Sequence, residues 1–201
     1  MAERRSRRPR TAGTATSRVT AMRTSAFGAP LVIAANLAAP AAGLTAESAF
    51  GGAPIAQPAM RTLLFNVFGQ LVPSPGEFAA RCQIADTTYL GVSAEFVRQA
   101  ILTDPVLAPV NYVNDLFDCD DYVQYLRTRM ALLGANRRLA APLAVGFILT
   151  AEHAFNFCVG PTGQLTLINT QSDDRAVVSD PSAFAAFMWV SNANRVQSIY
   201  V

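Results

Sequence analysis

Cys119 and His153 are the two residues of this sequence whose types could carry out covalent chemistry together. Cys119 stands among three aspartates in "LFDCDDYVQYL", and His153 is the only histidine of the chain. A thiol can attack a carbonyl carbon once a neighbouring base takes its proton, and imidazole is suited to that task near neutral pH. If this protein uses a histidine base, the base can only be His153.

The sequence around Cys119 predicts that the thiol lies at the start of a helix. Asp118 fits the N-cap position, and Asp121 completes an aspartate form of the capping box. The helix dipole and the free backbone N–H groups of a first turn lower the pKa of a thiol. The carboxylates of Asp118, Asp120 and Asp121 act in the opposite direction, unless a cation such as an imidazolium compensates them.

A β-hairpin after His153 can supply a group that orients the imidazole ring. The sequence "GPTG" at 160–163 is typical of a three-residue hairpin loop with a glycine bulge. The register set by this loop places Gln171 opposite His153 and makes Asn169 its diagonal neighbour on the same face. Either amide could then hold the ring, whereas a slip of one residue would turn both away.

The remaining sequence predicts the elements that position these groups. Helical periodicity appears in 59–71, in 94–102 after the N-cap Ser93, and from Cys119 to Gly134, which is a natural helix stop. The last third consists of short β-rich segments, which predict an antiparallel meander, a short helix after Asp180 and a final strand at 196–201. Helices followed by a sheet indicate an α+β domain.

These segments resemble papain-like cysteine peptidases. The phrase "FDCDDY" starts a helix with cysteine, and "GFILTAEHAFNFCVGPTGQLTLINTQ" starts a strand with histidine in an HAxN context. Both features are similar to the C-terminal protease domain of the fairy-ring mushroom agglutinin and its bacterial relatives. The resemblance covers about residues 110–175 and implies a papain-like fold, with the nucleophile helix packed on an antiparallel sheet. The sugar-binding trefoil of the agglutinin is absent, so lectin activity is not implied.

Carried over by position, the resemblance implies that Cys119 is the nucleophile and His153 the general base. The acidic residue of the agglutinin subgroup falls on Asn169, and asparagine is the usual orienting residue of papain-like enzymes. These enzymes also use an upstream side-chain amide, with the backbone N–H of the cysteine, to hold the oxyanion. Asn114 is the candidate for that amide here, ahead of Asn111.

Calcium is the one cofactor that the resemblance implies, and no other is expected. Aspartate oxygens are suitable ligands for this ion, but no EF-hand spacing supports a site. The residues that could supply such oxygens are Asp118, Asp120, Asp121, Asp173 and Asp174.

The expected reaction is therefore cysteine-dependent acyl transfer on a protein or peptide substrate. Water as acceptor gives a peptidase or amidase, and an amine acceptor gives a transglutaminase-like enzyme. Two alternatives stay open: a catalytically inactive papain-like module with a structural or interaction role, and a metalloenzyme that uses His153 with Asp118 or Asp120. Cys158 is expected in the core, and a Cys82–Cys158 disulfide is conceivable only in an exported protein.

Charge divides the chain into an arm and a body. Residues 1–24 hold seven arginines and one glutamate, a charge of +6; the whole chain carries +2, so the remainder carries about −4. We expect residues 1–58 to be an Arg-rich disordered or targeting arm with a linker, and residues 59–201 to be the papain-like domain. The body shows no basic face for nucleic acid, and no segment reads as a transmembrane helix. A weak secretion signal after the arginines leaves both export and a cytoplasmic location open.

Overall fold

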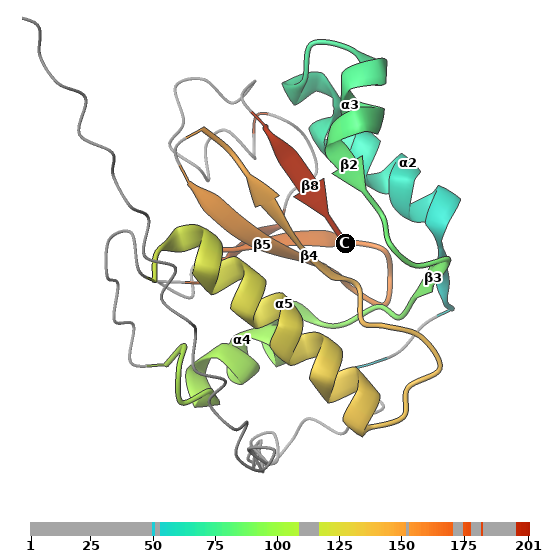
Figure 1. The fold of residues 1–201 in the computed structure, drawn as a ribbon. Coiled ribbons are helices and arrows are strands. Elements are labelled where there is room, and N and C mark those ends of the chain that lie inside the picture. Colours follow the sequence, from blue (N-terminus) through green and yellow to red (C-terminus); the bar gives the residue numbers. More distant parts are fainter. Residues whose placement is uncertain are drawn as a thin grey trace, which may run out of the picture. The chain divides into compact units, whose positions relative to one another are not determined.

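The computed structural model of the protein describes residues 50, 53–108, 117–151, 153–170, 175–177, 182 and 196–201. Its helices and strands follow one another along the chain as shown in Figure 1. In order they are β1 (Ile55–Ala56), α2 (Gln57–Phe68), the 3-10 turn η1 (Gly69–Leu71), α3 (Pro75–Arg81), β2 (Cys82–Gln83), β3 (Thr88–Tyr89), α4 (Ala94–Thr103), α5 (Cys119–Asn136), β4 (Val145–Leu149), β5 (Ala154–Val159), β6 (Leu165–Ile168), β7 (Arg175–Val177) and β8 (Ser198–Tyr200).

A six-stranded sheet in the order β2-β8-β4-β5-β6-β7 forms the centre of the fold. Its pairs are antiparallel, which confirms the expected meander, except that β2 runs parallel to β8 at one edge. The short strands β1 and β3 form a separate antiparallel pair. The α+β class expected from the sequence is confirmed, although the sheet is mixed because an early segment, β2, joins its edge.

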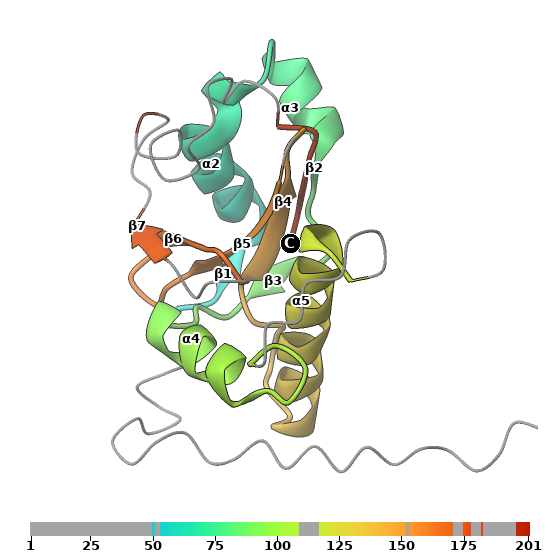
Figure 2. The ribbon, with the colours of Figure 1, turned by 90° about the vertical axis from the view of Figure 1, so that its left-hand side faces the viewer.

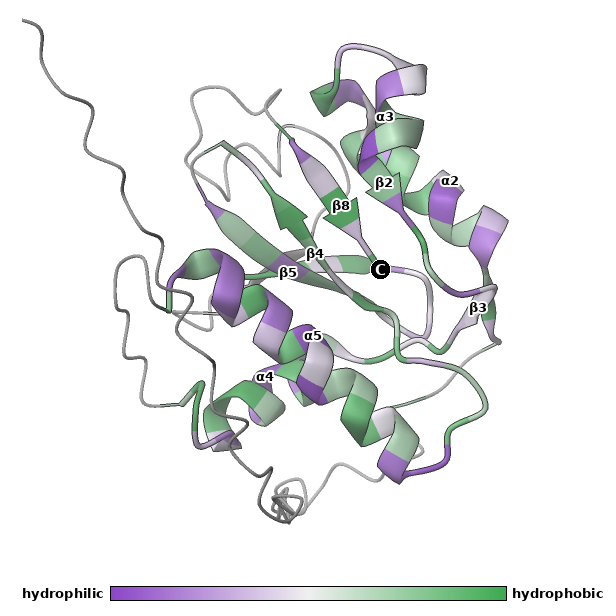
Figure 3. Cartoon of the chain, in the orientation of Figure 1, coloured by the Kyte–Doolittle hydropathy of each residue, from purple (hydrophilic) through white to green (hydrophobic). Residues whose placement is uncertain are grey.

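Helices cover both faces of the sheet, as Figure 2 shows. On one face, Met60 and Leu64 of α2 share a buried cluster with Phe157 of β5. On the other face, Leu126 of α5 shares a second cluster with Cys158, the next residue of β5. Since neighbouring residues of a strand point to opposite faces, β5 is buried on both sides, and Figure 3 shows its hydrophobic character.

The helix starts follow from local sequence rules. Ser93 caps α4 by accepting a hydrogen bond from the backbone N–H of Phe96 at 3.2 Å, as its position predicts. Ser74 caps α3 in the same way, through the backbone N–H of Glu77. These caps satisfy N–H groups that the first turn of a helix leaves without intrahelical partners.

Ordered packing begins before Ala59, where the sequence places the domain start. Strand β1 lies within the segment expected to be a linker and pairs with β3. Phe50 packs edge-on against Phe96 of α4, with 4.6 Å between ring centroids, and the guanidinium of Arg137 lies 5.1 Å from the centre of the Phe50 ring.

Several expected features lie outside the described residues. They include the Arg-rich arm before residue 50, Asn114, Gln171 and, apart from Ser182, the helix expected after Asp180. Within the part of the chain that the structure describes, no helix combines the length and the apolar character that crossing a membrane requires.

Candidate active site

Helix α5 places Cys119 at its first position, as the sequence predicts. The Asp118 carboxylate accepts a hydrogen bond from the backbone N–H of Asp120, and the Asp121 carboxylate accepts one from the backbone N–H of Asp118, both at 3.3 Å. The capping box is therefore confirmed. The stop expected at Gly134 is wrong: the helix continues to Asn136, and the chain turns at Arg138, whose φ is +53°.

The hairpin after His153 has the register that the glycine loop predicts. Asn156 pairs with Ile168, and the rest of the β5–β6 ladder follows the same alignment. Gly163 takes the positive φ of +85° that the bulge requires, and its N–H donates to the carbonyl of Gly160 at 2.9 Å. Asn169 therefore follows the last residue of β6 as the diagonal neighbour of His153.

The backbone of His153 is fixed by a tight turn between β4 and β5. The backbone N–H of Thr150 donates to the carbonyl of His153 at 2.9 Å, and the Thr150 hydroxyl donates to the same oxygen at 2.8 Å. In return, the His153 N–H donates to the Thr150 hydroxyl oxygen at 3.0 Å. The half-buried imidazole also meets the ring of Phe155 edge-on, with 4.4 Å between centroids.

A side-chain hydrogen bond joins Asn169 to His153. Burial lowers the pKa of His153 below its ordinary value, and the bond to Asn169 offsets this only in part by raising the pKa. The imidazole is therefore mostly neutral near pH 7, which is the form that can accept a proton. Of the two amides that sequence reasoning left open, Asn169 contacts the ring, and Gln171 lies outside the described residues.

The thiol of Cys119 lies against the first residue of β5. Cys119 packs on a small cluster formed by Val123, Phe147 and Ala154, and its sulfur interacts with the backbone of Ala154. Because Ala154 directly follows His153, this contact brings the start of the nucleophile helix to the start of the histidine strand. The structure thus brings together the two segments that carry the candidate pair.

Burial sets the protonation state of Cys119. Desolvation raises the pKa of its thiol, hydrogen bonding to the Ala154 backbone lowers it, and the charges of Asp118 and Asp120 raise it again. The net pKa lies above the ordinary value. The activation expected from the helix start is therefore outweighed by burial, which the local sequence does not reveal, so the resting group is a protonated thiol.

A buried polar group links α5 to the sheet beneath the site. The Asn156 side-chain N–H₂ group donates to the carbonyl of Val123 at 2.9 Å and to that of Gly146 at 3.2 Å. The Thr170 hydroxyl donates to the Asn156 side-chain oxygen. Both side chains are almost fully buried. Thr170 directly follows Asn169, so the network anchors the orienting residue; sequence reasoning did not single out Thr170.

The aspartates near Cys119 do not by themselves form a calcium site. Donor atoms of Asp118, Cys119 and Asp120 lie within 4.8 Å of one another. Calcium takes six to eight oxygen ligands, whereas this group offers two carboxylates and a soft sulfur. A hydrogen bond that protonated Asp120 donates to the Asp118 carboxylate raises the pKa of Asp120, so these two carboxyl groups already interact. Asp173 and Asp174 lie outside the described residues.

The other two cysteines are buried and separate. None of the three cysteines, all of which the structure describes, forms a disulfide. Cys82 belongs to the core on the α2 side of the sheet and Cys158 to the core on the α5 side, so the disulfide considered from the sequence does not form. Burial raises the pKa of Cys82 to about 11. Cys119 is therefore the most accessible thiol of the chain.

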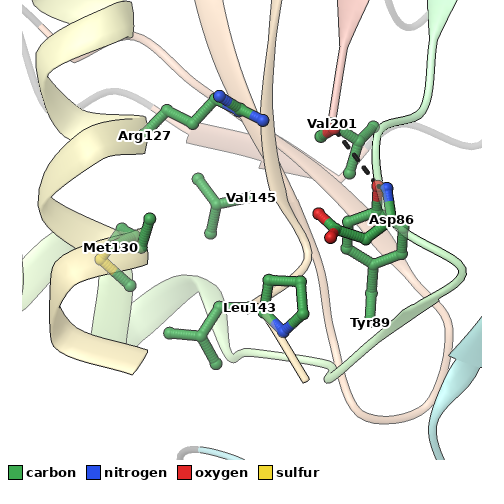
Figure 4. Close-up of a pocket in the computed structure, with 9 residues that line it drawn as sticks. Asp86, Tyr89, Arg127, Met130, Leu143, Val145 and Val201 are labelled. Carbon is green, nitrogen blue, oxygen red and sulfur yellow. Dashed lines mark hydrogen bonds between the residues drawn. The ribbon is translucent and has the colours of Figure 1, made fainter. Parts of the chain in front are cut away.

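Two pockets lie farther along α5 and share Arg127. The smaller one has a volume of about 90 Å³, and Figure 4 shows Arg127 reaching from α5 across Val145, with Asp86 and Tyr89 opposite. The Tyr89 hydroxyl donates to the main-chain oxygen of Val201 at 3.3 Å. The larger pocket, of about 540 Å³, opens beside the β2–β8 edge of the sheet.

Comparison with known proteins gives a fold relation only. No family model matches the chain, and no curated protein matches it. Among solved structures, one named "PSL1a-E64 complex" is similar with a TM-score of 0.51 and 17% sequence identity. The match covers 74% of this chain and 50% of that chain, so it spans about half the length of the solved protein. At this identity the likeness concerns the fold and not the activity.

Proposed function

We propose that this protein is a cysteine-dependent acyl transferase with a papain-like fold and that its reaction is hydrolysis of peptide bonds. Cys119 is the nucleophile, His153 the general base and Asn169 the residue that orients the imidazole. The observation that carries the proposal is the combination of the Asn169–His153 hydrogen bond with the contact of the Cys119 thiol on Ala154, next to that histidine.

The chemistry follows from the resting protonation states. His153 takes the proton of Cys119 as the sulfur bonds to the substrate carbonyl carbon, and the protonated imidazole then gives this proton to the leaving amine. Water adds to the thioester with His153 again as base, which releases the acid and restores the thiol. If an amine takes the place of water, the same steps give a transglutaminase-like product.

The comparison with solved structures contributes a likeness of fold and suggests one chemical probe, E64. The structural neighbour is named as a complex with E64, which makes E64 a reasonable probe for the thiol of this chain. Calcium, suggested by the resemblance to the agglutinin protease, is retained as a condition to vary in activity assays and has no assigned role in the steps above.

The test is selective labelling of thiols in the full chain. Iodoacetamide or E64 is added, and the modified cysteine is identified by peptide mass spectrometry. Cys82 and Cys158 serve as internal controls because their side chains are 3% and 0% exposed. We expect Cys119 to react first, His153→Ala to slow its reaction, and Cys119→Ala to abolish turnover of a peptide library while the fold is retained.

Equal and slow labelling of all three thiols, together with no turnover by the native protein, would contradict the proposal. Cys119→Ser is the matched variant, since it retains the size of the side chain and replaces the sulfur by a poorer nucleophile. Circular dichroism of each variant separates loss of chemistry from loss of fold.

A second candidate is an inactive papain-like module with a structural or interaction role. It is favoured by one observation: burial and the adjacent aspartates hold the pKa of Cys119 above its ordinary value. A thiol that stays protonated is a poor nucleophile, as expected for a residue without a catalytic role. This candidate predicts that Cys119→Ala retains the full biological role of the protein, whereas the enzyme predicts its loss.

A further inference from the structure

The larger pocket lies at the β2 edge of the six-stranded sheet, where side chains come from a helix on each face of the sheet. Its lining includes Arg61 of α2, Gln83 of β2, Arg127 of α5 and Tyr200 of β8. Strand β2 is the outermost strand, so side chains from opposite faces converge around it. At about 540 Å³ the pocket falls within the size range of ligand sites.

The two arginines of this pocket are half-buried, whereas Arg137 and Arg138, which also make no ion pair with a described carboxylate, are exposed. Three ion pairs among the described residues join an arginine to a carboxylate: Arg81 with Glu77, Arg98 with Glu95, and Arg129 with Asp104. Arg61 and Arg127 make no ion pair with any described carboxylate, although both are half-buried. The body is acidic overall, which makes two such cations beside one pocket unusual.

The polarity of the pocket fits an anion. None of the side chains that line it is acidic. Asp86 is acidic and lines the neighbouring smaller pocket, which also includes Arg127, as Figure 4 shows. The main-chain oxygen of Val201 is already occupied, because it accepts hydrogen bonds from the backbone N–H of Ala85 and from the Tyr89 hydroxyl, both at 3.3 Å.

One hydrophobic cluster, with Val123, Phe147 and Ala154 buried at its centre, lies between this pocket and the thiol. Cys119, Val123 and Arg127 follow one another at intervals of four residues, so they lie along one side of α5. Tyr200 belongs to the cluster on which Cys119 packs, and it also lines the pocket. Its ring stacks on Phe147, with 4.8 Å between centroids.

The distance from Cys119 to Arg127 along α5 determines how many residues of an extended peptide lie between the attacked bond and the pocket. Arg127 follows Cys119 by eight positions along the helix, which corresponds to a rise of roughly 12 Å. An extended peptide covers that length with about three or four residues. A peptide whose carbonyl lies at Cys119 could therefore place another side chain in the pocket.

We propose that Arg61 and Arg127 form a specificity site that binds an acidic side chain of the peptide substrate, three or four residues from the bond attacked by Cys119. The inference rests on the proposed peptidase function and names its substrate class. A guanidinium can hold a carboxylate through two parallel hydrogen bonds, and an uncharged amide of the same shape would lose this pairing. Gln83 and Tyr200 also line the pocket, and both side chains carry polar groups.

The experiment compares matched peptides that differ only by glutamate or glutamine. The variable residue is moved from the fourth position before the cleaved bond to the fourth position after it, and kcat/KM is measured for the full chain. Arg61→Gln, Arg127→Gln and the double variant remove the charges. Arg138→Gln is the control, because Arg138 is exposed at the far end of α5.

We expect glutamate to be favoured by roughly tenfold or more at one position, the size of a charge-assisted hydrogen bond. In the double variant this ratio falls towards one, whereas the control variant Arg138→Gln keeps the native ratio. Arg127→Glu should reverse the preference towards lysine. An unchanged glutamate preference in the double variant, or none in the native protein, would overturn the inference.

A binding measurement separates this inference from the proposed function. Fluorescence anisotropy with the same peptides and the Cys119→Ala protein requires no chemistry. If the native protein cleaves no peptide but glutamate peptides still bind more tightly in an Arg61- and Arg127-dependent way, the peptidase proposal fails and the acidic site stands. If the protein cleaves peptides but binds the glutamate and glutamine peptides equally tightly, the acidic specificity site is wrong and the peptidase proposal stands.

Discussion

Replacing Asn156 by leucine should destabilise the fold through the network beneath the site. Leucine has the same branching and the same number of heavy atoms, so the change removes hydrogen bonds with little change of shape. Asn156 donates to the carbonyls of Val123 and Gly146 and accepts from the Thr170 hydroxyl. Each bond contributes about 1 kcal/mol, and an orphaned buried hydroxyl adds a penalty of similar size, partly offset by the apolar side chain. The expected cost is about 3 kcal/mol.

Urea unfolding followed by circular dichroism measures this cost. The midpoint should fall while the slope with denaturant stays constant, and Tm should drop by roughly 6 to 12 °C, at about 2 to 4 °C per kcal/mol for a protein of this size. Thr170→Val removes the hydroxyl that Asn156→Leu leaves without its acceptor. The double variant should therefore be more stable than the sum of the two single losses implies.

Two results would refute the reasoning. A loss below about 1 kcal/mol in Asn156→Leu would mean that the three hydrogen bonds contribute little. Strict additivity in the double variant would mean that Asn156 and Thr170 act independently. Thr128→Val is the control variant, because the Thr128 hydroxyl donates to a backbone carbonyl on the exposed side of α5, so its loss should be small.

The remaining predictions concern protonation and packing. Labelling of Cys119 by iodoacetamide should keep rising with pH up to and beyond 9, because the thiol pKa lies above 9.0; a plateau near pH 6 would instead indicate a preformed ion pair. The value of kcat/KM should fall as the pH drops through the pKa of His153, below 6.5, because a protonated imidazole cannot accept a proton. Asn169→Ala removes the bond that raises this pKa, so the acid limb should move to lower pH while kcat decreases. Gly146→Ala should prevent folding, because its Cβ would lie 2.1 Å from the Tyr200 carbonyl oxygen; soluble protein with a normal Tm would contradict this.

The sequence predicted those parts of the site that depend on local rules. The helix start at Cys119 follows from the capping aspartates, whose bonds form within three residues. The position of Asn169 relative to His153 follows from the "GPTG" loop, because a turn type fixes the register of its hairpin. In both cases the partners are close in sequence, so their geometry does not depend on the rest of the fold.

Features that depend on distant segments could not be predicted in this way. The parallel pairing of β2 with β8 joins residues more than one hundred positions apart. Arg61 and Arg127 converge only because β2 is an edge strand. The role of Thr170 depends on a buried asparagine of another strand and on a carbonyl of α5. These contacts arise from packing, which has no signature in the spacing of residues along the chain.

The pKa of Cys119 decides how the proposed enzyme must work. A helix start favours the thiolate, but burial and two neighbouring carboxylates favour the thiol, and the second group of effects is larger. The pKa of His153 is lowered at the same time, so both partners are neutral at pH 7 and neither is activated at rest. Attack must then proceed together with proton transfer, and substrate binding must supply the remaining stabilisation of the charge that develops. A peptide held by its acidic side chain at Arg61 and Arg127 would supply binding free energy at a distance from the bond, which is one way in which a weakly activated thiol becomes selective.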